Sequence, residues 1–197
     1  MIYLNTTDIS GGVISANNIT NTQGQWLINT ALNMSSKGDA DKWGIVVCSH
    51  FPIHMYVFNE ASQYYGDEIF PDLKKVICAY KDKSSGTAYE TSYDFKSEKA
   101  ELIATFHGHI HNFKVYDVAT NGGNIVKAIC IPNGCPNREN PYGEVFQEVD
   151  NNGNAVSYPK TAGTAEDTSF NAVVIDQDNK TIYAHCYGAG IDREISY

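Results

Sequence analysis

The feature that most limits how this chain can fold is a pair of short apolar runs that each lead into histidine. The run Gly44–Cys48 is followed by His50, and the run Leu102–Phe106 is followed by His107–His111, which holds three of the six histidines. Apolar runs of this length are typical of strands buried in a sheet when glycine or proline bounds them. The histidines are therefore expected where two buried strands end.

The second of these segments has the spacing of a metal-binding motif. His109 and His111 are separated by one residue, and alternate residues of an extended chain project to the same side. Gly108 lets the backbone turn sharply at this point. Imidazole is a common ligand for zinc, manganese and iron. The spacing favours a shared metal site, while the other interpretation is a polar loop whose histidines have no common role.

The first segment has a similar arrangement. His50 directly follows its strand, and Pro52 then directs the chain away from it. A second strand that ends in histidine favours a shared site over an unrelated polar loop. His54 lies four residues after His50, so it is a candidate substrate contact, the alternative being a histidine satisfied by its neighbours. His107 has the same two interpretations, a substrate contact or a histidine satisfied by its neighbours.

Together the two segments resemble the later motifs of the calcineurin-like metallophosphoesterases. Those motifs are Ser-His-x-Pro and Gly-His-x-His, matched here by Ser49–Pro52 and Gly108–His111, and Gln23–Leu27 is similar to the helix that precedes them. The family's first three motifs, Asp-x-His, Gly-Asp-x-x-Asp and Gly-Asn-His, do not occur, and the nearest approach is Gly38–Lys42. The resemblance covers the second half of the catalytic domain, so we interpret the chain as a C-terminal fragment.

The resemblance implies an α+β fold: the C-terminal half of an α/β/β/α sandwich, consisting mainly of one mixed β-sheet with flanking helices. Residues 1–197 are predicted to form a single domain, with a polar insertion over residues 133–169. Half a sandwich leaves one apolar sheet face uncovered, and large exposed apolar surfaces mark interaction sites. The chain is therefore expected to pair with a second copy of itself or with its missing N-terminal half.

The resemblance also implies a function. The complete protein would hydrolyse phosphate mono- or diesters with water activated by two divalent metal ions, manganese, iron or zinc. His50 and His109 would bind one ion and His111 the other, whereas the fragment would hold one ion or none and be weakly active or inactive. The alternative is a non-catalytic interaction or structural module with vestigial histidines. A complete single-zinc hydrolase is disfavoured, because no Asp or Glu lies close to the histidines in sequence to act as a general base. The nearest one, Asp117, lies in the next predicted strand.

Composition narrows the choice of partners. The net charge of −9 argues against binding to a nucleic-acid backbone, which normally requires a basic surface. No apolar run is long enough to cross a membrane, and no signal peptide occurs in these residues. We expect a cytoplasmic protein, although any signal preceding Met1 would change that expectation. The C-terminal residues 188–194 resemble closing segments of bacterial and phage members of the family.

The pattern of apolar residues predicts the remaining elements. A helix is expected from an N-cap at Thr22 to about Ser36, with Trp26 in the core, and a second helix from Pro71. Residues 7–22 and 81–100 are expected to be mainly loops, and Cys48, Cys78 and Cys130 to be buried thiols. Further strands are predicted over Ile2–Thr6, Phe113–Val118, Ile125–Ile131, Phe170–Asp176 and Thr181–Tyr187.

Overall fold

The computed structural model describes residues 1–10, 13–16, 19–54, 70–109, 113–132, 147–149, 155–157 and 163–197. The chain divides into two compact units. The first contains Met1–His107 and Tyr116–Ala128, and the second contains Gly108–Val115 and Ile129–Tyr197. In the described part of the chain, no helix combines the length and the apolar character that a membrane crossing requires.

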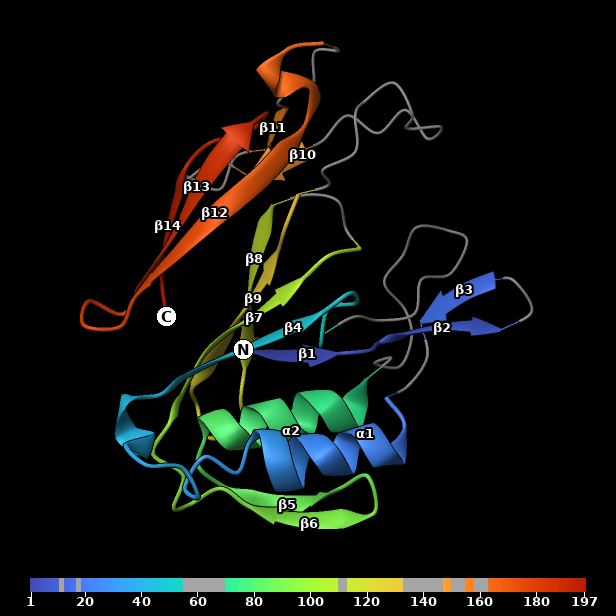
Figure 1. Cartoon of the computed structure of the whole chain (residues 1–197), viewed down its shortest axis with the longest axis vertical. Helices are drawn as coiled ribbons and strands as arrows, with labels where there is room; N and C mark the ends of the chain where they lie inside the picture. Colours follow the sequence, from blue (N-terminus) through green and yellow to red (C-terminus); the bar gives the residue numbers. More distant parts are fainter. Residues whose placement is uncertain are drawn as a thin grey trace. The chain divides into compact units, whose positions relative to one another are not determined.

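A five-stranded mixed sheet forms the centre of the first unit, as the α+β prediction requires (Figure 1). Its order is β1-β4-β7-β9-β8, and β4 pairs in parallel with both β1 and β7. The terminal residues of β8 and β9 belong to the second unit. The strands are β1 (Ile2–Leu4), β4 (Gly44–Ser49), β7 (Glu101–His107), β8 (Lys114–Ala119) and β9 (Ile125–Cys130).

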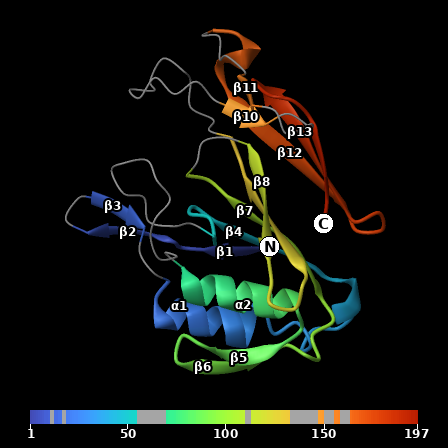
Figure 2. The ribbon, with the colours of Figure 1, turned by 180° about the vertical axis from the view of Figure 1, so that it is seen from behind.

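Two helices pack beside this sheet, and a hairpin lies beyond them. Helix α1 (Asn21–Trp26) continues as a π-helical segment, η1 (Leu27–Ala31), and α2 (Pro71–Lys81) leads into the hairpin. The hairpin consists of β5 (Ser85–Ala88) and β6 (Thr91–Asp94). The opposite views of Figures 1 and 2 both place α1 and α2 between the sheet and the hairpin.

The apolar side of α2 anchors these layers. Leu73, Val76, Ile77 and Tyr80 recur at helical spacing, and each has an exposed fraction of 0%. They share one core with the inward-facing residues of the sheet strands and of η1. Pro71 occupies the first turn of the helix, where its missing N–H costs no hydrogen bond. The prediction for this helix is confirmed.

The N-terminal segment differs from its prediction in three ways. Thr20, rather than Thr22, caps α1, because its side chain accepts a hydrogen bond from the Gln23 N–H at 3.2 Å. The helix ends at Ala31, before the expected Ser36. Trp26 has an exposed fraction of 43%, so the prediction that it lies in the core was wrong, while the neighbouring Leu27 is fully buried.

Two segments expected to be loops form antiparallel hairpins. One is β2 (Thr7–Ser10) with β3 (Val13–Ala16), and the other is the β5–β6 hairpin described above. The β5–β6 turn uses Tyr89 and Glu90 with φ angles of 51° and 58°. Positive φ at both central residues is the geometry of a type I′ turn, which Asn and Gly normally supply. The sequence therefore carries no recognisable turn signal here.

The second unit contains a three-stranded antiparallel sheet in the order β12-β13-β14. The predicted hairpin is confirmed as β12 (Ser169–Asp176) and β13 (Thr181–Gly188), and β14 (Arg193–Ser196) was not predicted. Much of the polar insertion lies outside the described residues. Its described parts are β10 (Gln147–Val149), β11 (Ala155–Ser157) and a short 3₁₀ turn, Ala165–Asp167.

The thiols differ in their burial. Cys130 is buried and Cys48 and Cys78 are half-buried, and none of the three forms a disulfide. Burial raises the pKa of the Cys130 thiol to about 12, although the charge of Lys114 lowers it. Burial also raises the pKa of Cys48. A raised pKa disfavours the reactive thiolate, so Cys48 and Cys130 are structural residues.

The close contact between α1 and the β5–β6 turn gives a stability prediction. A Cβ atom on Gly24 would overlap the buried ring of Tyr89, whereas one on Gly38 would meet no atom within 4 Å. We expect Gly24→Ala to lower the free energy of unfolding by about 1–3 kcal/mol, and Gly38→Ala to change it little. Urea titrations followed by tryptophan fluorescence measure this in the first unit, which contains both tryptophans. Equal stabilities of the two variants would contradict the packing described.

Candidate metal centre

The two predicted histidine segments leave adjacent strands of the sheet. Strands β4 and β7 are parallel neighbours, and their last residues, Ser49 and His107, are register partners. Neighbouring strands lie about 4.8 Å apart, and parallel strands end at the same edge. Segments separated by more than fifty residues in sequence therefore start side by side. In sheets with parallel strands, ligands bind most often at this carboxyl edge.

The turn that carries His50 is held by backbone and hydroxyl groups. The Ser49 hydroxyl donates to the Phe51 carbonyl at 2.8 Å, and the Phe51 N–H donates to the Thr6 hydroxyl at 3.0 Å. Phe51 is buried, and its ring centroid lies 4.9 Å from that of His50 in an edge-on contact. His50 itself is exposed. The sequence thus places an accessible imidazole on a firmly anchored turn.

His107 is a structural residue, which is the second of the two interpretations that its sequence position left open. Its exposed fraction is 1%, and its ring lies between two hydroxyls: Ser49 at 2.9 Å from Nδ1 and Thr105 at 2.7 Å from Nε2. Burial, with a smaller contribution from the charge of His54, lowers the pKa of His107 to about 3, and a hydrogen bond with the Phe51 backbone partly opposes this shift. The imidazole is therefore neutral at physiological pH.

His54, the candidate substrate contact, packs among aromatic rings. It is half-buried, with its ring centroid 4.2 Å from that of Tyr116 and 6.4 Å from that of His107. These contacts show that the ring packs against its neighbours. Its role toward a substrate stays a prediction. Asp117, the carboxylate considered as a general base, forms an ion pair with Lys127 at 2.7 Å.

The remaining two predicted ligands belong to the other segment. His109 is half-buried in the second unit and has a φ angle of 66°. A left-handed backbone at a residue with a side chain is uncommon, and such strain gathers at functional sites. His111 lies outside the described residues. Among the residues that the structure describes, no group of three or more histidines, cysteines or carboxylates could hold a metal ion.

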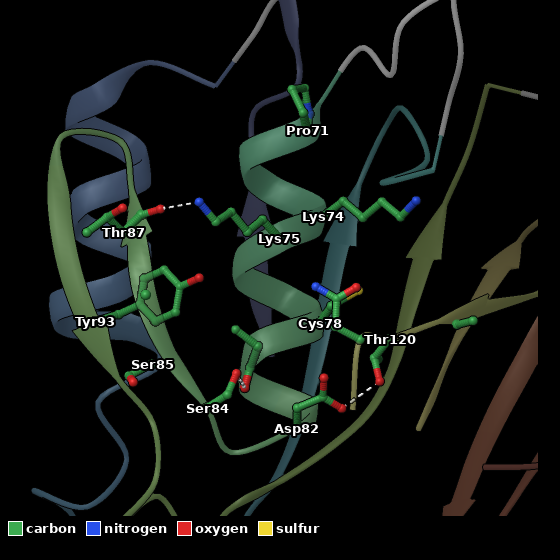
Figure 3. A pocket seen from close by; sticks show the side chains of 14 residues that line it. Pro71, Lys74, Lys75, Cys78, Asp82, Ser84, Ser85, Thr87, Tyr93 and Thr120 are labelled. Carbon is green, nitrogen blue, oxygen red and sulfur yellow. Dashed lines mark hydrogen bonds between the residues drawn. The ribbon is translucent and has the colours of Figure 1, made fainter. Parts of the chain in front are cut away.

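A separate polar groove runs between α2 and the β5–β6 hairpin, with a volume of about 490 Å³. Figure 3 shows Lys75 directed across it to the Thr87 carbonyl, which it reaches at 2.6 Å. Asp82, at the end of α2, accepts hydrogen bonds from Thr120, Gly122 and Asn124. Lys75 and Asp82 are thus engaged within the protein, and we assign no ligand to the groove.

The groove also lies away from the histidine segments. Lys81 and Lys83, which flank Asp82, donate to the carbonyls of Leu102 and Ala100 at the amino end of β7. His107 is at the opposite end of that strand. The candidate metal centre and the groove are therefore at different edges of the sheet.

Comparisons with protein-family profiles, with curated proteins and with solved structures give no match. The function is therefore inferred from the fold and from the geometry at the ends of β4 and β7. The metal-binding interpretation of His50, His109 and His111 stays a prediction.

The buried neutral imidazole of His107 predicts a pH-dependent stability. Below about pH 6.5 the unfolded chain binds a proton at this residue, whereas the folded chain remains neutral to about pH 3. Stability is therefore complete above the unfolded pKa and falls as the pH drops. The loss from pH 7.5 to pH 5 should be about 2 kcal/mol. Carboxylates contribute mainly at lower pH, so this window isolates histidine.

Urea unfolding at several pH values, monitored by tryptophan fluorescence, measures this loss. We expect His107→Gln to be less stable at pH 7.5 but to lack most of the pH dependence. The matched variant His185→Gln changes an exposed histidine of the second unit, and its pH dependence should equal that of the unmodified chain. Parallel pH curves for His107→Gln and the unmodified chain would contradict the assignment.

Proposed function

We propose that this chain carries the histidine ligands of a metal-dependent phosphoesterase. The observation that supports the proposal is the pairing of Ser49 with His107 at the ends of two parallel strands. This pairing makes the segments containing His50 and His109 start at one edge of the sheet. The resemblance of both segments to the calcineurin-like metallophosphoesterase motifs then favours phosphate-ester hydrolysis over other metal chemistry.

The available donors fit one metal ion better than two. Imidazoles at His50, His109 and His111 form a donor set that suits zinc or manganese, and His107 is already engaged by two hydroxyls. The carboxylates near the amino end of β7 are engaged too, Asp82 by three donors and Glu98 by two backbone N–H groups. A bound ion would supply a polarised water and a positive charge facing phosphate oxygens.

The role of the chain's own residues follows from this donor set. His50, His109 and His111 orient the ion as neutral imidazoles, so affinity should decrease as the pH falls through the ordinary histidine range. His54 is proposed to contact the substrate near His50. Because the chain lacks the acidic motifs of the family, we expect it to be weakly active or inactive without a partner that supplies them.

Metal titration tests the proposal directly. We expect the chain to bind Zn²⁺ or Mn²⁺, and the double variant His109→Ala/His111→Ala to bind at least tenfold more weakly because two of three ligands are lost. His50→Ala should weaken binding similarly. Competition with a chromophoric chelator measures each affinity.

His185→Ala is the matched control, because His185 is an exposed histidine paired with Asp192 on the second unit. It should leave the affinity unchanged. Equal binding by the chain and the double variant would contradict the proposed ligands. Hydrolysis of bis(4-nitrophenyl) phosphate by the isolated chain, lost in the double variant, would contradict the expectation of weak activity while supporting the site.

We also propose that the edge of the sheet at β1 is where the chain associates with a second copy. Tyr3 and Trp43 have exposed fractions of 70% and 49%, and they line an apolar hollow of about 510 Å³ beside η1. This edge therefore offers protruding apolar side chains, Tyr3 and Trp43, beside an apolar hollow. A self-complementary dimer contact requires both kinds of surface on the same patch. In the described sheet, β1 is the last strand, and such strands readily pair with another chain.

Sedimentation equilibrium tests this association. We expect a concentration-dependent dimer, and Tyr3→Lys should raise its dissociation constant at least tenfold by placing a charge in the contact. Val174→Lys is the matched control, since Val174 is an exposed apolar residue of β12 in the second unit. A monomer at all concentrations would contradict self-association and would favour a partner supplying the missing acidic motifs.

A further inference from the structure

The hydrogen bonds around His107 determine which of its ring nitrogens carries the proton. The Ser49 hydroxyl has one proton, and it is directed to the Phe51 carbonyl at 2.8 Å. The Ser49 oxygen must then act as acceptor toward His107 Nδ1, 2.9 Å away. Nδ1 is therefore the protonated nitrogen.

The other side of the ring agrees with this assignment. With the proton on Nδ1, Nε2 is an acceptor, and the Thr105 hydroxyl lies 2.7 Å from it. The Lys127 carbonyl is a further acceptor near that hydroxyl, at the longer distance of 3.5 Å. Thr105 is fully buried, so its hydroxyl cannot donate its proton to bulk water. A directed chain of hydrogen bonds results, from Thr105 through His107 and Ser49 to the Phe51 carbonyl.

We propose that His107 is a positioning residue for His50: held as the Nδ1–H tautomer by Thr105, it fixes the Ser49 hydroxyl that closes the turn carrying His50. This inference rests on the proposed function, because it gives His50 the role of a metal ligand. His50 sits between Ser49 and Phe51, and both of these residues are tied to the buried interior while His50 is exposed. A ligand on such a turn binds without first losing backbone freedom.

The chain of hydrogen bonds explains why this end of β7 holds a histidine. Only an imidazole can accept from one buried hydroxyl and donate to another on opposite sides of a rigid ring. A Thr105→Val variant removes the donor to Nε2 and so removes the reason for the Nδ1–H tautomer. A Ser49→Ala variant keeps the tautomer's Thr105 partner but removes the hydroxyl link to Phe51, leaving the direct hydrogen bond between His107 and the Phe51 backbone. Comparing the two variants therefore distinguishes the effect of the His107 tautomer from the effect of the Ser49 hydrogen bond that closes the turn.

Nuclear magnetic resonance on the whole chain provides a readout that a purely structural role would not change. Long-range ¹H–¹⁵N spectra of the histidines should show protonated Nδ1 and unprotonated Nε2 at His107. Thr105→Val should give a mixture of tautomers, and the conservative Thr105→Ser should restore the original pattern. A dominant Nε2–H tautomer in the unmodified chain would overturn the inference.

The second measurement tests whether the turn responds. The Phe51 amide donates to Thr6, and we expect Ser49→Ala and Thr105→Val to raise its hydrogen-exchange rate about tenfold, and to weaken Zn²⁺ affinity about tenfold. Thr120→Val is the matched control, since it removes another buried threonine hydroxyl in the first unit, at Asp82. It should leave both the exchange rate and the affinity unchanged.

The outcomes distinguish the two proposals. Absence of Zn²⁺ binding in the unmodified chain would overturn the proposed function, and the tautomer and Phe51 exchange would still report on the hydrogen-bond chain. Binding that Ser49→Ala and Thr105→Val leave unchanged would overturn the positioning role of His107 while the metal site stands. An effect of Thr120→Val equal to that of Thr105→Val would also overturn it, because general loss of stability would then account for both.

Discussion

The parallel pairing of β4 with β7 is the interaction on which the rest of the first unit depends. It brings two apolar runs together in the middle of the sheet, where the residues of β4 and β7 are largely buried. It also decides where the polar ends of both runs emerge. Because parallel strands end at one edge of the sheet, the pairing makes two histidine segments that are distant in sequence start next to each other in space. A shift of the register by one residue would exchange the inward and outward faces and remove the pairing of Ser49 with His107.

The two ends of β7 use polar groups differently. Near its amino end, Glu98 accepts the Met34 and Ser35 amides at 3.0 and 2.8 Å, and Asp82 collects three donors from the turn after β8. Burial raises the pKa of Asp82, but these hydrogen bonds outweigh burial and lower it below the usual range. Carboxylates there are structural, since their oxygens complete the hydrogen bonding of chain turns. At the other end, the described polar groups are imidazoles and hydroxyls, which suit a metal ion or a phosphate oxygen as well as they suit the protein.

The sequence predicted the elements whose stability comes from their own pattern. The apolar runs of β4 and β7 and the stripe of α2 are periodic, and they appear where expected. The β5–β6 hairpin was missed because its turn places Tyr89 and Glu90 at positive φ, a choice stabilised by packing of Tyr89 on Gly24 rather than by turn chemistry. The partners of His107 could not be predicted for a similar reason. Its partner Ser49 is separated from it by fifty-eight residues, so only the register of the folded sheet reveals the contact.

His107, His50 and His185 show how the position of a histidine relative to a strand end determines its burial and its partners. His107 is the last residue of β7, where it is enclosed by the sheet, and burial lowers its pKa to about 3. His50, one residue beyond the end of β4, is exposed on a turn tied to the interior. His185 lies within β13 and pairs with Asp192, whose pKa is lowered by hydrogen bonds from the Cys186 amide and from His185. A displacement of one residue along a strand is thus enough to separate a neutral structural imidazole from one that solvent and ions can reach. This explains why adjacent histidines in such segments have different roles.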